Sequence, residues 1–174
     1  GLPFSFTDVY GKVTINTNTG SKFSFFGFNF NDAVTYSGIS DLNWKNVGGG
    51  ANFIITPGNS SSLVSGGFYY SDYAINLDEF DGKPRQSAIN GFDANIKVTS
   101  YLPNHSELNY GVEFAGFKTM YQFYNYVSIL QEQNEYTTQV GGFMKYKKNF
   151  GDKLIFEPGV RIQYYASTNV PRFE

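Results

Sequence analysis

The sequence predicts an all-β protein, an antiparallel transmembrane β-barrel, and three observations lead to that prediction. Hydrophobic residues recur at every second position over most of the 174 residues. Aromatic residues make up 19% of the chain and charged residues 16%, below the roughly 25% charged residues of an average soluble domain. Short turns alternate with longer connecting segments, as in barrels whose two rims differ. The length suits one domain, residues 1–174.

The clearest expected strand runs from Phe92 to Val98, with apolar residues at even positions and Asp93, Asn95 and Lys97 between them. Leu108–Phe114 and Leu154–Tyr164 alternate in the same way. Weaker alternation predicts five more strands, which bring the total to eight: Val9–Thr17, Lys22–Phe30, Val47–Ile55, Leu63–Leu77 and Thr138–Lys147. The phase changes near Gly27, where we expect a β-bulge. Six glycines are expected on the polar face: Gly48, Gly50, Gly66, Gly111, Gly141 and Gly159.

The connections between these strands are expected to alternate in length. Residues that tolerate tight turns form four short connections, namely Asn18–Ser21, Pro57–Ser60, Pro103–Ser106 and Asn149–Asp152. Three longer segments are expected as loops at the opposite rim, namely Asn31–Asp41, Asp78–Ala88 and Tyr121–Glu135. His105 is interpreted as an exposed turn residue.

Strand length and the two faces favour a membrane barrel over a soluble β-sandwich or barrel, which remains the alternative. The strands reach the 9 to 11 residues that a tilted membrane strand needs. The polar face carries charges of both signs, which a packed soluble core would not accept. The apolar face is expected to continue to both strand ends and to finish there in rings, namely Tyr69, Tyr73, Tyr101, Tyr110, Tyr146, Tyr164 and Tyr165.

Composition excludes several functions. The chain has no Cys and one His, which argues against thiolate metal sites and multi-histidine zinc centres. A net charge of −2 argues against a basic nucleic-acid surface. Glu113 and Glu157 lie on separate strands without other support for a glycosidase pair. We therefore expect no enzyme activity, no catalytic residues, and no cofactor or metal.

Four stretches resemble the barrel domain of TonB-dependent receptors from Bacteroidota, and the resemblance covers essentially the whole chain. They are Gly1–Lys12, Gly20–Phe30, Ser40–Gly50 and Phe156–Ser167, the last followed by Pro171-Arg172. The resemblance implies a location in the bacterial outer membrane and import of a large solute such as a siderophore, glycan or peptide. Implied partners are the lipid bilayer, the receptor's own plug domain, TonB and, in some receptors, a surface lipoprotein lid.

In this family the barrel has roughly 22 strands around a plug, so eight strands would be about a third of the wall. The chain begins without a start Met or a signal segment, which suggests a piece of a longer precursor. Two alternatives stay open: a complete eight-stranded structural outer-membrane protein or adhesin, and a soluble all-β binding module. Glycines on the polar face favour the wide barrel, because a small one needs bulky side chains in its lumen.

Two groups of residues are candidate functional residues. Aromatic side chains crowd the longest expected loop and are candidates to grip a ligand or to extend a ring girdle: Tyr121, Phe123, Tyr124 and Tyr126. Charged side chains are expected to face the lumen, where they contact a plug or pair with each other: Asp93, Lys97, Glu113, Lys145, Lys147, Glu157 and Arg161. The acidic segment around Asp78, Glu79 and Asp81 is interpreted as a solvated loop rather than a Ca²⁺ site.

Overall fold

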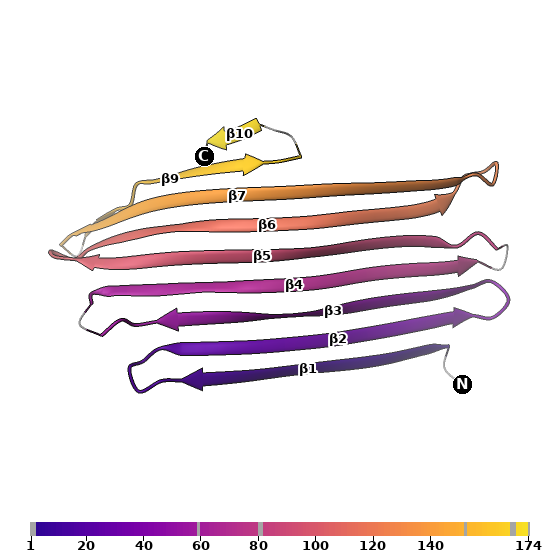
Figure 1. Ribbon diagram of the computed structural model, residues 1–174, viewed down its shortest axis with the longest axis horizontal. Helices are drawn as coiled ribbons and strands as arrows, with labels where there is room; N and C mark the ends of the chain where they lie inside the picture. Colours follow the sequence, from indigo (N-terminus) through magenta and orange to yellow (C-terminus); the bar gives the residue numbers. More distant parts are fainter. Residues whose placement is uncertain (1–2, 59, 80–81, 152, 168–169, 174) are drawn as a thin grey trace.

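The chain folds into one antiparallel β-sheet in a computed structural model, which describes residues 3–58, 60–79, 82–151 and 153–167 and the backbone of 170–173. Neighbouring strands follow the order β1-β2-β3-β4-β5-β6-β7-β9-β10, and β8 also pairs with β7 (Figure 1). The strands are β1 (Phe4–Asn16), β2 (Lys22–Tyr36), β3 (Ser40–Ile55), β4 (Ser62–Glu79), β5 (Arg85–Leu102), β6 (Ser106–Tyr124), β7 (Leu130–Phe150), β8 (Leu154–Phe156), β9 (Gly159–Tyr165) and β10 (Val170–Phe173). Within the described residues, no helix is present that could cross a membrane.

All eight predicted strands are present, the last of them interrupted. β8 and β9 pair with β7 in one register, since Lys148 lies opposite Phe156 and Lys145 opposite Gly159. Pro158 lies between them and has no N–H to donate to the ladder, although its carbonyl accepts a 2.9 Å hydrogen bond from the Tyr146 N–H. β10 was not predicted.

The expected long loops are mostly strand, which corrects the sequence prediction. β2 continues to Tyr36 and β3 begins at Ser40, and the other two long segments are likewise absorbed into the strands on either side. The strands are therefore 13 to 21 residues long in β1 to β7. Side chains in these stretches alternate between the two faces of the sheet, but polar residues occur on both faces there, so hydrophobicity alone does not reveal the stretches as strand. The connections at the two rims are three to six residues long between β1 and β8, so the expected alternation of short and long connections is wrong.

The bulge expected at Gly27 is absent. Gly27 lies opposite Gly11 on β1 and Gly49 on β3, and the register on both sides continues without a shift. Phe23 and Phe25 lie on one face of β2, and Phe26 and Phe28 lie on the other. The hydrophobic pattern of the sequence therefore shifts by one residue here, although the strand itself has no bulge.

The sheet is a single layer whose two faces are not covered by other described residues. Its accessible surface is 11785 Å², against about 8,500 Å² for a compact monomer of this mass. Ala88 is the one buried hydrophobic residue among those described. In this structure β1 and β10 lie at opposite margins and the sheet is not closed (Figure 1).

We define the two faces by β5. The apolar face carries Phe92, Ala94, Ile96 and Val98 and the residues in register with them, and the polar face carries Asp93, Asn95 and Lys97 and theirs. Two expectations about these faces are wrong. Gly66 lies opposite Phe53 and Ile96, so it belongs to the apolar face, and its neighbour Gly67 belongs to the polar face. Of the seven expected terminal tyrosines, the register places four on the polar face: Tyr69, Tyr73, Tyr101 and Tyr165.

Candidate functional site: the two faces of the sheet

The half of the apolar face near the short turns forms a continuous hydrophobic surface, which we call the apolar band. On β4 it runs from Val64 to Tyr70 and on β3 from Val47 to Ile55. Its central side chains are open to the surroundings, with exposed fractions of 52% for Phe68, 49% for Ile96 and 58% for Val112. Six to eight residue steps at ~3.4 Å give the band a length of about 20–27 Å along the strands.

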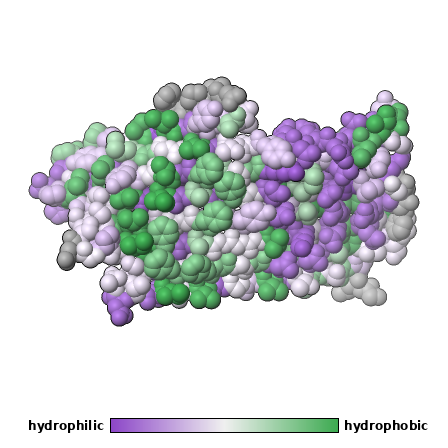
Figure 2. All heavy atoms as spheres, viewed as in Figure 1, coloured by the Kyte–Doolittle hydropathy of each residue, from purple (hydrophilic) through white to green (hydrophobic). Residues whose placement is uncertain are grey.

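Beyond the band, the same face becomes polar, contrary to the expected continuity to both ends. The row next to Tyr70 contains Asp72 on β4, Asn90 on β5 and Lys118 on β6. Lys118 lies over the ring of Tyr136, with Nζ 5.4 Å from the ring centroid. The face seen in Figure 2 has this division, with hydrophobic residues gathered toward the short-turn side and hydrophilic residues toward the other.

The register brings six of the seven charged residues predicted for the lumen onto the polar face, and the seventh, Glu157, lies between β8 and β9 and joins them through an ion pair with Lys145. The seven are Asp93, Lys97, Glu113, Lys145, Lys147, Glu157 and Arg161. Lys145 Nζ lies 2.5 Å from Glu157 Oε1, and Arg161 Nη2 lies 2.7 Å from Glu113 Oε2. Each of these side chains is about one-third to one-half exposed, so the pairing is of the modest surface kind.

Neutral polar side chains form further hydrogen bonds on the polar face. The Asn95 amide donates to Asp93 at 3.2 Å. Near the short turns, Thr99 donates to Asn109 at 2.7 Å, and the Asn109 amide in turn donates to Glu107 at 2.6 Å. The polar face therefore carries several separate groups of paired polar side chains of both charge signs, which suits contact with water or with a polar partner.

Aromatic rings on the polar face lie across glycines of the neighbouring strand. Phe28 lies opposite Gly48 and Phe26 opposite Gly50. A methyl group at Gly48 would come within 2.7 Å of the Phe28 ring. The rings can therefore lie flat against the backbone of the neighbouring strand, and they project little from the polar face of the sheet.

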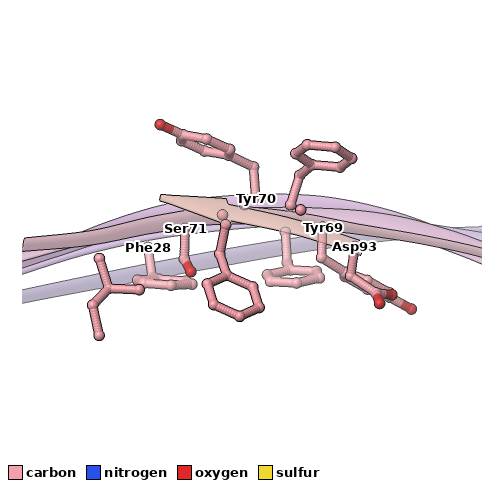
Figure 3. A pocket seen from close by; sticks show the side chains of 12 residues that line it. Phe28, Tyr69, Tyr70, Ser71 and Asp93 are labelled. Carbon is pink, nitrogen blue, oxygen red and sulfur yellow. The ribbon is translucent and has the colours of Figure 1, made fainter. Parts of the chain in front are cut away.

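These rings border a hollow of about 590 Å³ on the polar face, lined by Phe26, Phe28, Tyr69 and Phe117. Figure 3 shows Phe28, Tyr69, Ser71 and Asp93 on one side of the sheet and Tyr70 on the other. The floor is aromatic and the carboxylate of Asp93 stands at its margin, so the hollow suits a flat apolar group next to a polar one.

The four aromatic residues predicted as a ligand loop are only partly brought together. Tyr121 and Phe123 lie on the polar face with ring centroids 5.1 Å apart. Tyr124 lies on the apolar face opposite Leu130. Tyr126 is in the turn and is 97% exposed. Consecutive residues of a strand point to opposite faces of the sheet, so Tyr124 lies on the other face from Tyr121 and Phe123. The prediction that all four rings gather in one loop is therefore wrong.

The acidic segment gives no sign of a cation site in the described residues. Glu79 lies 3.5 Å from Arg85 and takes part in an ion pair, while Asp78 and Glu79 point to opposite faces because they are consecutive in β4. Asp81 lies outside the described residues. No group of three metal-ligating side chains occurs elsewhere in the described chain.

Sequence reasoning missed a row of amides on the polar part of the apolar face. Asn43, Asn76, Gln86 and Gln122 lie side by side on β3, β4, β5 and β6. The sequence does contain a signal for this row. Asn76 is an even number of residues from Phe68, and Gln86 is an even number from Phe92, so each amide lies on the same face as the apolar residues of its strand.

No protein-family model and no curated protein matches this chain.

Proposed function

We propose that this chain forms part of the wall of an outer-membrane β-barrel in a TonB-dependent receptor that imports a large solute such as a siderophore, glycan or peptide. The observation that carries the proposal is the apolar band. It crosses every strand from β1 to β9 on one face of a single-layer sheet, and no described residue covers it. A bilayer would cover such a face while the backbone stays paired within the sheet.

The dimensions of the band and its borders support a membrane position. About 20–27 Å along tilted strands is close to the ~25 Å apolar height of outer-membrane barrels. Tyr70 stands at one margin of the band, and Tyr110 and Tyr146 stand near the other. Tyrosine rings are enriched at both interfaces of such barrels. The parts of the strands beyond Tyr70, where the apolar face becomes polar, would project out of the membrane.

The polar face supports a wide barrel with an internal partner. Its ion pairs and its flat aromatic rings over glycines leave a thin wall, which suits a plug domain better than a lumen filled by side chains. β1 and β10 do not pair with each other, and in a barrel each edge would pair with a further strand. Tyr121 and Phe123 would stand near the mouth, where solute enters. The wall itself would perform no chemistry and hold no cofactor.

These 174 residues contain no cysteine, so one introduced cysteine is the single labelling site within them and tests this arrangement. Ile96→Cys lies in the apolar band and Asn95→Cys is its neighbour on the polar face. Each is labelled with bimane in outer-membrane extracts and reconstituted with brominated lipids. We expect quenching of the label at position 96 and little at position 95. Equal quenching, or none at either site, would contradict a lipid-facing band.

Peptide mapping and the denatured mass of the same polypeptide separate the receptor from a small barrel. A polypeptide several times longer than 174 residues, with a plug domain, supports the receptor. A lipid-facing band in a polypeptide of eight strands would instead indicate a structural outer-membrane protein or adhesin.

A further inference from the structure

The hollow of about 590 Å³ on the polar face has an open centre between aromatic rings (Figure 3). Ser71 on β4 lies directly opposite Gly91 on β5, so at this level the two strands together carry only one hydroxymethyl group. Phe28 lies on one side of this gap, with its ring against Gly48, and Phe117 lies on the other side, opposite Gly91. A planar group can therefore lie between the two rings.

The carboxylate at the margin of this hollow has no cationic partner in the described part of the chain. Asp93 lies directly opposite Tyr69 and accepts one hydrogen bond, from the Asn95 amide at 3.2 Å. Glu113 on the same face is instead paired with Arg161. A carboxylate beside aromatic rings favours a cationic ligand, because cation–π attraction adds to the charge pairing.

The polar face beyond the hollow, on the side away from the short turns, has an excess of negative charge. Its charged residues, among those described, are Asp8, Asp32, Glu79, Arg85 and Glu135. Arg85 is paired with Glu79, so three carboxylates remain without an ion pair in the described chain. This surface attracts cations toward the hollow and repels anions.

We propose that the hollow binds the guanidinium group of an arginine side chain in the imported solute, which is then a cationic peptide. A guanidinium group is planar, stacks on aromatic rings and pairs with both oxygens of a carboxylate. An ammonium group lacks this fork and is more strongly hydrated. The inference rests on the proposed function, in which the polar face lines the lumen, and it names the class of solute.

The test compares two peptides that differ only in charge. One is a blocked peptide of alternating glycine and arginine, and the other carries citrulline, the neutral isostere of arginine, in place of each arginine. Their binding to the full polypeptide in detergent is measured by isothermal titration calorimetry at low salt. Asp93→Asn removes the charge at nearly constant size, and Ser71→Leu fills the gap between the rings without changing the charge. The matched control is Asp72→Asn, which removes the same charge from the other face of β4.

We expect the natural protein and Asp72→Asn to bind the arginine peptide about tenfold more tightly than the citrulline peptide. Asp93→Asn and Ser71→Leu should both remove this preference. A preference that survives in either of these two variants, that is lost equally in Asp72→Asn, or that the natural protein lacks would overturn the inference. The proposed function fails by a different sign: quenching of a label at position 95 by brominated lipid would put the polar face in the bilayer.

Discussion

Arg161 on β9 forms an ion pair with Glu113 on β6, although β7 lies between the two strands. Gly141 on β7 lies directly opposite Glu113 in register, so the arginine side chain passes over it. A methyl group at Gly141 would lie 3.8 Å from Arg161 Nη2, which is ordinary contact. The path of the arginine therefore tolerates a methyl group there but not a large side chain.

A large side chain at position 141 is expected to uncouple this ion pair. In a double-mutant cycle, Glu113→Gln and Arg161→Gln should show a coupling free energy of about 0.2–1 kcal/mol, the range for partly exposed pairs. In the Gly141→Leu background the coupling should vanish, because leucine occupies the path of the guanidinium. The measurement is urea unfolding of the full polypeptide in lipid vesicles. Gly141→Ala is the control and should keep the coupling; its loss there would contradict the proposed path.

Glycine at position 48 is expected to be required for close packing. A methyl group there would lie 2.6 Å from the Tyr70 carbonyl oxygen and 2.7 Å from the Phe28 ring. The ring can turn away, but the carbonyl belongs to the sheet backbone. Gly48→Ala should therefore lower the free energy of unfolding by about 1–3 kcal/mol, as overpacking does. Gly142→Ala, where the nearest atom is 3.9 Å away, is the matched control; equal losses in both variants would show that close approach is not the cause.

The turn between β5 and β6 stores backbone strain at two residues. Asn104 and His105 have φ of 61° and 56°, in the left-handed region that costs most residues roughly 1–2 kcal/mol. Asparagine tolerates this region and histidine less so. His105→Gly should raise the urea midpoint and His105→Val should lower it. An unchanged midpoint in both variants would mean that the turn relaxes at no cost.

The sequence predicted the strands well, because alternation survives wherever one side chain in two is apolar. From Phe92 to Val98 the predicted faces are the observed ones. The prediction of which face a residue occupies failed where neighbouring residues do not differ in hydrophobicity. Gly66 and Gly67 are adjacent and identical, so only the register with Phe53 reveals which of them shares the apolar face.

The hydrogen-bonded register also explains why the candidate residues were only partly predictable. Six of the seven charges share a face because they lie in strands that the alternation predicted, and Glu157 joins them through its ion pair with Lys145. Tyr121 and Tyr124 were placed in one loop because the polar strand ends around them lack apolar residues that would mark a period. Pairing of β6 with β7 as far as Tyr124 and Leu130 puts their rings on opposite faces. The point at which two strands of a hairpin stop pairing is not encoded in local hydrophobicity.

A charge in the apolar band should be far more damaging than the same charge one residue away. Ile96→Lys puts an ammonium group on the proposed lipid face, whereas Asn95→Lys puts it on the polar face beside Asp93. Lysine at the bilayer midplane costs about 2–4 kcal/mol. We therefore expect Ile96→Lys to lower the free energy of unfolding in vesicles by that amount and to reduce assembly in the outer membrane, while Asn95→Lys leaves both nearly unchanged. Since the two positions share a strand and differ only in face, equal losses would place lipid on neither face and would require a different cover for the apolar band.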